Sequence, residues 1–434
     1  MLTLKANLIV NNKVKLTTKD SKAFEGVVLP DTNSKKVVLK LDSGYNIGLL
    51  ISNIKEVKII SKSKKQTSKK ETTSKFNKKL PTISILHTGG TIASQADYET
   101  GAVIAKFTPE ELLSKFPELK TLCNINSSLI GNMFSEDMRF SHYNKLITAI
   151  QKEIKKGTDG IIITHGTDTL AYTSAALAFA LEGLNTPILL VGAQRSSDRG
   201  SSDAFLNLLG ACQYIANSNF SEVGICMHES SDDKSCLILS PTKTKKFHSS
   251  RRDAFQSVNG EPIARVFSDG KYENISKIHK TESKLIIRPF KENIKVGILK
   301  AHPNMFAKEI TNYSAFNGLI IEGTGLGHLP VNETDKETKE NSKILKAIKS
   351  LSKSIPVFMT TQTTFGRVNL NVYSSGRKLK ELEINGDYND MLSETAFIKM
   401  SWLLSNYPKS KVNELMNQNL RGEISKRSSK KKFL

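Results

Sequence analysis

Two threonines stand in matching contexts in this sequence. Thr91 lies in Thr-Gly-Gly-Thr-Ile-Ala at 88–93, and Thr167 lies in Thr-His-Gly-Thr-Asp-Thr-Leu at 164–170. In both segments a short apolar, β-branched run breaks at glycine and is followed by the threonine, which is how a buried parallel strand presents a side chain at its carboxyl end. Two hydroxyls at one edge of a sheet predict hydroxyl-based acyl transfer.

Acyl transfer by a hydroxyl needs a proton acceptor and donors that stabilise an oxyanion, and the same two segments supply some of these groups. A threonine hydroxyl is a weak nucleophile near neutral pH unless a neighbouring group accepts its proton. Asp168 places a carboxylate directly after Thr167. Gly89 and Gly90 permit a tight turn and can expose backbone N–H groups to a developing oxyanion.

The elements that must position these residues begin near residue 81. Apolar runs typical of strands occur at 83–86, 160–164, 187–192 and 223–227, and helical segments at 141–155 and 170–184. A second α/β unit has strand-like runs at 296–299, 318–323 and 355–360 and ends in an amphipathic helix at 393–404. Alternating strands and helices with buried strands predict a doubly wound parallel sheet.

The amino-terminal part has a different pattern. Residues 1–61 alternate short β-type runs with turn residues, which predicts a small closed β-barrel of the SH3-like or Sm-like type. We therefore expect five parts: the barrel at 1–61, a basic flexible linker at 62–80, α/β units at 81–290 and 291–408, and a basic tail at 409–434 that is loose from residue 419 onward.

Composition limits the partners and the compartment. The formal net charge of +21 over 434 residues favours a polyanionic partner such as nucleic acid, although a lysine-biased proteome and solvated basic clusters in the linker and tail would give the same number. Cys123, Cys212, Cys226 and Cys236 lack the spacing of a zinc site, so we expect packed thiols and no metal. Without a signal-peptide pattern or a long apolar span, a cytoplasmic location is expected.

The two threonine blocks resemble the signature blocks of the bacterial-type L-asparaginases, and the likeness extends from about residue 81 to 408. This resemblance implies an asparaginase-like body of two parallel-sheet units that hydrolyses a side-chain amide and releases ammonia. It implies Thr91 as the nucleophile, assisted by Thr167, Asp168 and a lysine. Lys246, nine positions before Phe255, aligns with that lysine, while Lys243 and Lys245 remain rival assignments.

The same resemblance implies the substrate ligands. Tyr98 is similar to the flap tyrosine that orients the nucleophile, and Ser135 and Glu136 match the block that holds the α-amino and α-carboxylate groups of the substrate. The second unit departs from the pattern, because Leu326 stands where many asparaginases have asparagine and residues 366–373 offer no glutamate for a neighbouring subunit. The site must therefore be completed differently. His302 and His328 are expected to make structural hydrogen bonds rather than to act as bases.

The barrel, the glycine-rich turn at 323–328 and the block Ser-Arg-Arg-Asp-Ala-Phe at 250–255 together resemble the D subunits of the archaeal glutamyl-tRNA(Gln) amidotransferases, over nearly the whole chain. The implied activity is hydrolysis of glutamine. The ammonia passes to a partner E subunit, which uses ATP and magnesium to convert glutamyl-tRNA(Gln) into glutaminyl-tRNA(Gln). This chain itself is expected to bind no cofactor and to form a homodimer within an assembly of two D and two E chains.

Two other functions remain open from the sequence. One is a free-standing L-asparaginase or glutaminase that has acquired a barrel and a basic tail. The other is a non-catalytic RNA-binding scaffold with an asparaginase-like body, although a decayed site has no reason to keep Thr91, Thr167, Asp168 and Lys246 together. Activity that depends on a partner and on glutamyl-tRNA would separate the amidotransferase subunit from the metabolic hydrolase.

Overall fold

The structure is a computed structural model that describes residues 8–10, 12–29, 32, 35–41, 46–61, 76–90, 94–96, 103–105, 117–195, 202–277 and 284–428. The expected linker at 62–80 therefore lies outside the described residues up to residue 75, and so do residues 429–434 of the tail. Within the described ranges, no helix is long and apolar enough to cross a lipid bilayer.

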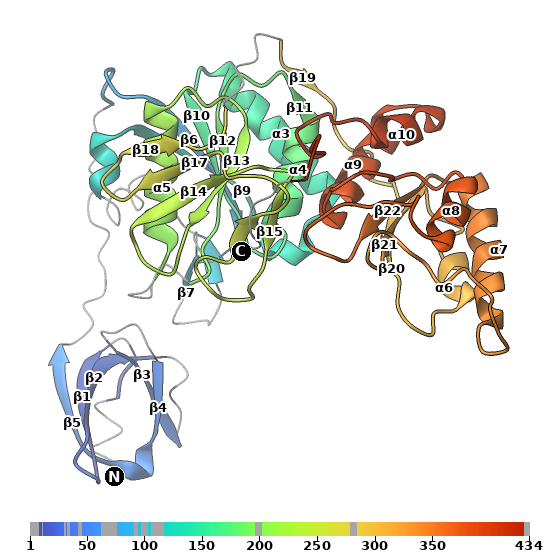
Figure 1. Cartoon of the computed structure of the whole chain (residues 1–434). Coiled ribbons are helices and arrows are strands. Elements are labelled where there is room, and N and C mark those ends of the chain that lie inside the picture. Colours follow the sequence, from blue (N-terminus) through green and yellow to red (C-terminus); the bar gives the residue numbers. More distant parts are fainter. Residues whose placement is uncertain are drawn as a thin grey trace.

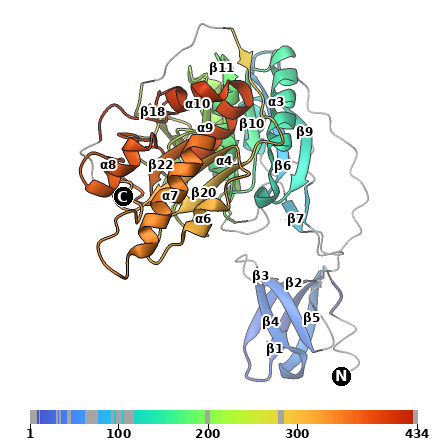
Figure 2. The ribbon, with the colours of Figure 1, turned by 90° about the vertical axis from the view of Figure 1, so that its right-hand side faces the viewer.

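The amino-terminal residues form a separate small β-unit, as expected (Figures 1 and 2). Its antiparallel strands lie in the order β4-β3-β2-β1-β5 and comprise β1 (Lys13–Thr18), β2 (Ala23–Val28), β3 (Lys36–Leu41), β4 (Asn46–Leu50) and β5 (Ile54–Ser61), with a 3-10 turn at Ile51–Asn53. Val14 and Leu16 alternate with polar neighbours and are fully buried, so β1 turns one face to the core of this unit.

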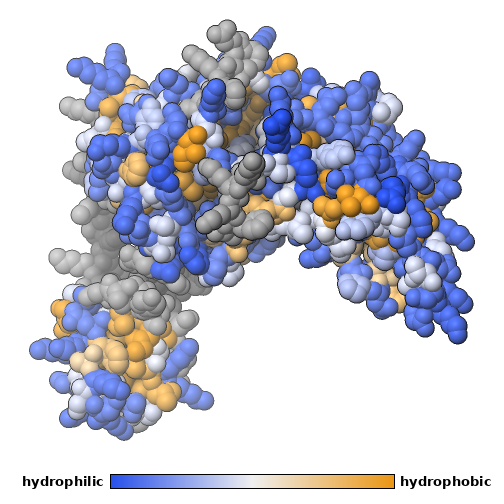
Figure 3. All heavy atoms as spheres, in the orientation of Figure 1, coloured by the Kyte–Doolittle hydropathy of each residue, from blue (hydrophilic) through white to orange (hydrophobic). Residues whose placement is uncertain are grey.

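Apolar side chains also remain on the surface of this small unit. Ile9, Leu50 and Ile60 are about half exposed or more. Figure 3 shows apolar residues gathered on the visible face of β1–β5, while hydrophilic residues cover most of the visible face of the two α/β units.

The first α/β unit is built on an eight-stranded sheet in the order β18-β17-β14-β13-β12-β10-β6-β9. Its parallel strands are β6 (Thr82–Gly89), β9 (Asn124–Met133), β10 (Gly160–Thr164), β12 (Ile188–Val191) and β13 (Val223–His228). The antiparallel strands β14 (Ser235–Leu239), β17 (Ala264–Phe267) and β18 (Tyr272–Asn274) extend one edge. The sheet is thus parallel from β13 to β9, as predicted, and antiparallel at the other edge.

Helices cover both faces of this sheet. They are α3 (Phe140–Lys155), α4 (Leu170–Ala180) and α5 (Ala204–Asn217). Ile161 and Ile163 of β10 pack in the cluster that contains α3 and α4, whereas Ile162 packs in the cluster that contains α5. Because the strand is buried on both faces, its sequence is a continuous apolar run.

One predicted helix is too long. The segment 170–184 is helical only to Ala180, because Leu181 and Glu182 pair as strand β11 with β19 (Ile286–Ile287). The shorter elements of this unit are β7 (Ser94–Ala96) paired with β8 (Val103–Ala105), β15 (Thr244–Lys246) paired with β16 (Phe255–Ser257), and 3-10 turns at Pro117–Thr121 and Ser135–Asp137.

The second α/β unit has a three-stranded parallel sheet of β20 (Val296–Lys300), β21 (Gly318–Gly323) and β22 (Val357–Thr361). Its helices are α6 (Ala307–Thr311), α7 (Lys339–Ser354), α8 (Ser374–Glu381), α9 (Ser393–Asn406) and α10 (Lys409–Met416). Helix α9 packs against α4 of the first unit, where the rings of Phe179 and Trp402 lie 5.5 Å apart. The two units therefore share a core through α9.

The tail was predicted to be loose from residue 419, and this is wrong for the described residues 419–428. Glu423 is fully buried and forms an ion pair with the fully buried Lys399, with 2.6 Å between Oε1 and Nζ. Its carboxylate also accepts hydrogen bonds from the backbone N–H groups of Leu420 and Arg421. A charged segment can be ordered when each buried charge has its partners, and the partner Lys399 lies on α9.

Candidate active site

The two glycine-rich turns meet at the carboxyl ends of neighbouring strands. β6 and β10 are adjacent and parallel, with His87 opposite Thr164, and the Thr88 hydroxyl donates to the Thr164 carbonyl oxygen over 2.9 Å. Gly90, with φ +81°, lies so close to Gly166 that a Cβ on Gly90 would be 2.6 Å from the Gly166 nitrogen. Thr91, the predicted nucleophile, directly follows this contact in the chain but lies outside the described residues.

Gly90→Ala should destabilise the fold by about 3 kcal/mol, since an alanine there has a left-handed backbone and its Cβ meets the backbone of the neighbouring turn. Urea unfolding measures the loss. Gly157→Ala is the matched control, because Gly157 has the same φ of +81° and a Cβ there would meet nothing within 4 Å. Equal losses for the two variants would contradict the close approach of the turns.

Lys246, at the end of β15, reaches the second turn. Its Nζ donates to Thr167 Oγ1 over 2.9 Å and to Asp168 Oδ1 over 2.7 Å. The Lys246 side chain is 15% exposed, whereas the Asp168 side chain is 66% exposed. A hydroxyl, an amine and a carboxylate therefore form one hydrogen-bonded chain whose acidic end faces solvent.

The two rival lysines have other partners. Lys243 forms an ion pair with Asp390, with 3.1 Å between Nζ and Oδ2, and Lys245 forms one with Glu394 over 2.7 Å. Lys245 and Lys246 are successive residues of a strand, so their side chains leave on opposite faces. Of these three lysines, Lys246 is the one placed on Thr167.

The methyl group of Thr167 packs against residues that the sequence did not suggest as part of the site. The Thr167 Cγ2 methyl packs against Gly192 so closely that a Cβ on Gly192 would be only 2.8 Å from it. Gly192 is itself held by Asn207, whose Nδ2 donates to the Gly192 carbonyl oxygen over 3.0 Å. The methyl contact leaves the Thr167 hydroxyl facing Lys246. No spacing signal marks Gly192 or Asn207, because both act through contacts between distant segments.

Ser135 and Glu136 lie at the next part of the site. Ser135 is 5% exposed, and its Oγ would be 2.9 Å from a Cβ on Gly166, so it borders the second turn. The Thr169 hydroxyl donates to the Ser135 carbonyl oxygen over 2.6 Å. Glu136 is exposed, and Tyr98 lies outside the described residues. The structure thus brings Ser135, Thr167, Asp168 and Lys246 together, while the roles of these residues stay predictions.

The histidines of the second unit make local contacts. His302 forms an ion pair with Glu309 over 2.8 Å, and hydrogen bonds to the Pro303 carbonyl and to Glu309 raise its pKa. His328 Nδ1 lies 3.2 Å from Ser375 Oγ, and burial lowers the pKa of His328. The carbonyl oxygen of Leu326 accepts from the Asn369 N–H.

Two histidines inside the site are buried in the neutral form. Burial lowers the pKa of His87 and of His165 to about 4. His165 Nδ1 donates to the Gly166 carbonyl oxygen over 2.7 Å, so its Nε2, 2.9 Å from Thr173 Oγ1, can accept from that hydroxyl. Protonation of His165 would remove this acceptor.

Stability should therefore fall in mild acid. The unfolded pKa of histidine is 6.5, so between pH 6.5 and 4 the unfolded chain binds more protons and the free energy of unfolding rises with pH. The stabilisation is complete above pH 6.5 and is lost as the pH falls to 4, on the order of 3 kcal/mol per histidine. Urea titrations at pH 7 and 4.5, followed by the fluorescence of Trp402, the single tryptophan, measure it. A free energy of unfolding that does not change between pH 7 and 4.5 would contradict the role of the buried histidines. So would a His165→Gln variant whose free energy of unfolding falls with pH as steeply as that of the wild type.

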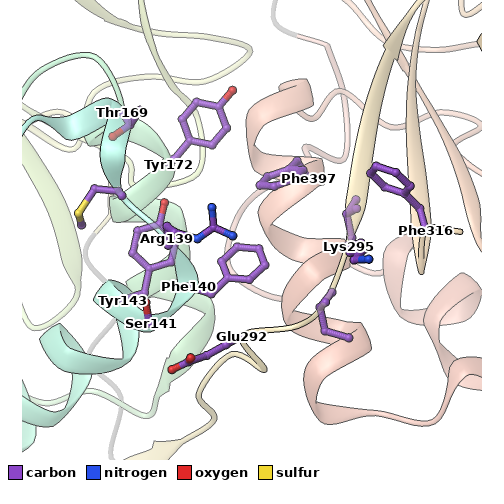
Figure 4. A pocket seen from close by; sticks show the side chains of 13 residues that line it. Arg139, Phe140, Ser141, Tyr143, Thr169, Tyr172, Glu292, Lys295, Phe316 and Phe397 are labelled. Atoms are coloured by element: carbon purple, nitrogen blue, oxygen red, sulfur yellow. The ribbon is translucent and has the colours of Figure 1, made fainter. Parts of the chain in front are cut away.

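A cavity of about 590 Å³ lies beside this site, between the two α/β units. Figure 4 shows Thr169 and Tyr172 on the side of the first unit and Phe397 and Lys295 on the side of the second, with the Arg139 side chain directed into the space between them. Burial raises the pKa of Tyr172 well above its usual range, so its phenol stays neutral. The cavity adjoins the second glycine-rich turn at Thr169 and is not lined by Thr167, Asp168 or Lys246.

Comparison with protein-family models gives three matches. Residues 9–60 match the GatD N-terminal domain, residues 82–279 the N-terminal domain of asparaginase, and residues 295–416 the glutaminase/asparaginase C-terminal domain. The last match includes α10, which the sequence had assigned to the tail.

Curated relatives match over nearly the full length. The D subunit of the glutamyl-tRNA(Gln) amidotransferase of Pyrococcus furiosus is 42% identical over 433 residues, covering 97% of this chain and 95% of that protein. The corresponding D subunit of Methanosphaera stadtmanae is 41% identical, with 99% and 97% covered.

Solved structures match the two α/β units. The thermostable L-asparaginase from Thermococcus kodakarensis is 28% identical with a TM-score of 0.71, covering 80% of this chain and 100% of that one. L-asparaginase I from Vibrio cholerae is 26% identical with a TM-score of 0.67, covering 80% and 99%. The remaining fifth of this chain includes the amino-terminal β-unit, which the curated relatives share.

Proposed function

Since the chain belongs to the family of the D subunits of glutamyl-tRNA(Gln) amidotransferases, we propose that it is the glutaminase subunit of a tRNA-dependent amidotransferase. It hydrolyses glutamine and supplies ammonia for the conversion of glutamyl-tRNA(Gln) into glutaminyl-tRNA(Gln). A partner E subunit performs the second step with ATP and magnesium. The observation that carries the chemistry is the hydrogen-bonded chain of Thr167, Lys246 and Asp168 beside the turn that leads to Thr91.

In the proposed mechanism the Thr91 hydroxyl attacks the side-chain carbonyl carbon of glutamine. Lys246 takes up the hydroxyl proton through Thr167 and returns it to the leaving nitrogen, so ammonia departs and an ester remains on Thr91. Backbone N–H groups of the glycine turn stabilise the oxyanion. Water then hydrolyses the ester, which gives glutamate and regenerates Thr91.

The substrate's α-amino and α-carboxylate groups need separate ligands. The Asp168 carboxylate is two-thirds exposed while one of its oxygens is held by Lys246, so it can also bind an α-ammonium group from the solvent side. Ser135, buried against Gly166, and the exposed Glu136 complete this part of the pocket, and Tyr98 orients Thr91.

A partner is a chemical requirement of this function. Free ammonia is mostly protonated at neutral pH and must travel by a sheltered route to remain nucleophilic. The formal net charge of +21 supports assembly with an RNA-bearing complex, whose stability should fall with salt as phosphate contacts are screened. We propose a homodimer of this chain within an assembly of two D and two E subunits.

The test combines the purified chain with a candidate E subunit, glutamyl-tRNA(Gln), ATP, magnesium and amide-labelled glutamine. Labelled glutaminyl-tRNA(Gln) should form only when both proteins are present. Product that forms at the same rate without this chain would contradict the proposal.

A free-standing L-asparaginase or glutaminase is the second candidate, because the solved structures that match the body are L-asparaginases. Such an enzyme needs neither partner nor tRNA. The rate of the isolated chain therefore separates the two functions.

A further inference from the structure

The segment that leads into Lys246 is bound to the second α/β unit by side chains other than that of Lys246. Lys243 forms an ion pair with Asp390, three residues before α9, and Lys245 forms one with Glu394 in the first turn of α9. The Lys243–Asp390 pair is buried, with side-chain exposures of 9% and 2%. The Lys245–Glu394 pair is partly exposed, at 32% and 24%.

A third bond joins the same two segments. The Thr395 hydroxyl donates to the Thr242 carbonyl oxygen over 2.8 Å. Residues 242–245 are therefore bound by three side chains from residues 390–395. These contacts span some 150 positions of sequence and cross the boundary between the two units.

Asp390 also holds the far end of the hairpin formed by β15 and β16. Its backbone oxygen accepts from Asn259 Nδ2 over 3.0 Å, and the Val258 N–H donates to the Lys243 carbonyl oxygen over 2.8 Å. The remaining carboxylate oxygen of Asp390 accepts from the Ser425 N–H over 2.9 Å. Both oxygens of this buried carboxylate are thus used, one by Lys243 and one by the ordered tail.

We propose that Asp390, assisted by Glu394, positions Lys246 for proton transfer, so that the second α/β unit sets the geometry of a catalytic group in the first. The inference rests on the proposed glutamine hydrolysis. Lys243 directly precedes the short strand β15, which ends at Lys246, and a shift at Lys243 is therefore carried to the Lys246 side chain. A misplacement of about 1 Å can lower a rate by about 10²-fold.

The charge of Asp390 is what keeps Lys243 in place. Burial lowers the pKa of Lys243, and Asp390 opposes this shift by stabilising the cation. Without the carboxylate, Lys243 either loses its proton or moves toward water, and in both cases the bond that fixes this part of the strand is lost.

The experiment measures kcat and KM for glutamine under the conditions in which the wild-type chain turns over. Asp390→Asn should lower kcat by about 10²-fold with KM within about twofold. Adding Lys243→Gln to Asp390→Asn removes the unpaired charge and permits an amide–amide hydrogen bond, so most of the lost kcat should return. Glu394→Gln, at the more exposed pair, should lower kcat by about threefold.

Glu153→Gln is the matched control for loss of a buried carboxylate. Glu153 is 4% exposed and bonds to Ser84 and Lys156 at the opposite end of the sheet, so this variant should lose stability but keep its kcat. Wild-type kcat in folded Asp390→Asn and Glu394→Gln, or a change in KM instead of kcat, would overturn the positioning role. If Asp390→Asn does not fold, Glu394→Gln and the double variant decide the matter.

Different results would contradict the proposed glutamine hydrolysis and the proposed positioning role of Asp390 and Glu394. If the wild-type chain releases no ammonia from glutamine in the presence of an E subunit and glutamyl-tRNA(Gln), or Lys246→Met is as active as the wild type there, the proposed function itself fails. If Lys246→Met is inactive while the Asp390 and Glu394 variants match the wild type, only the positioning role fails.

Discussion

Replacement of Lys246 by methionine should lower kcat for glutamine about 10³-fold while the chain stays folded. Methionine keeps the apolar stem of this largely buried side chain but removes both hydrogen bonds, to Thr167 and to Asp168. Loss of a general acid–base group typically costs 10²–10⁴-fold in rate, roughly. Ammonia release at saturating glutamine measures kcat, and thermal unfolding checks the fold.

The two rival lysines provide the comparison. Lys245→Met removes an ion pair with Glu394 and should cost only severalfold in kcat, since Lys245 leaves the opposite face of the strand. A larger loss of kcat in Lys245→Met or Lys243→Met than in Lys246→Met would contradict the assignment of Lys246.

Thr167→Val should be nearly as damaging, with kcat lowered about 10³-fold. Valine has the shape of threonine and keeps the methyl contact with Gly192, but it cannot receive the Lys246 hydrogen bond or relay a proton. The same ammonia assay at saturating glutamine measures the loss.

Thr167→Ser is the complementary variant, because it keeps the hydroxyl and loses the methyl group. Its kcat should fall only about tenfold. If the serine and valine variants lose equal activity, the packing of Thr167 matters rather than its hydroxyl, and the proposed proton relay is wrong.

The local sequence predicted the place of the site. Parallel strands with continuous apolar runs, each ending in glycine and threonine, indicated that the turns at 88–93 and 164–170 meet at one sheet edge, and β6 and β10 are adjacent there. The small β-unit and the two α/β units were also predictable, because hydrophobic period and turn chemistry are local properties.

The choice between three neighbouring lysines was not predictable from local sequence. Each lysine has the same chemistry, and their different partners, Asp390, Glu394 and Thr167, come from distant parts of the chain. The resemblance to a known family favoured Lys246. The ion pairs with Asp390 and Glu394 are the physical reason why Lys243 and Lys245 do not contact Thr167.

The order of the tail was missed for a related reason. Residues 419–428 look like a solvated basic segment, and only the fully buried Lys399 on α9 reveals why Glu423 is buried. The antiparallel strands β17 and β18 were missed as sheet members because strands of four and three residues carry a weak periodic signal, and the buried apolar strand β14 was not among the expected strands either.

The most direct test of the central claim is ammonia release from glutamine and from asparagine by the purified chain, first alone and then with an E subunit and glutamyl-tRNA(Gln). We predict glutamine hydrolysis that depends on the partner and the tRNA and is abolished in Thr91→Ala. Strong turnover of asparagine by the chain alone, unchanged by the partner, would contradict the account and make the protein a metabolic asparaginase.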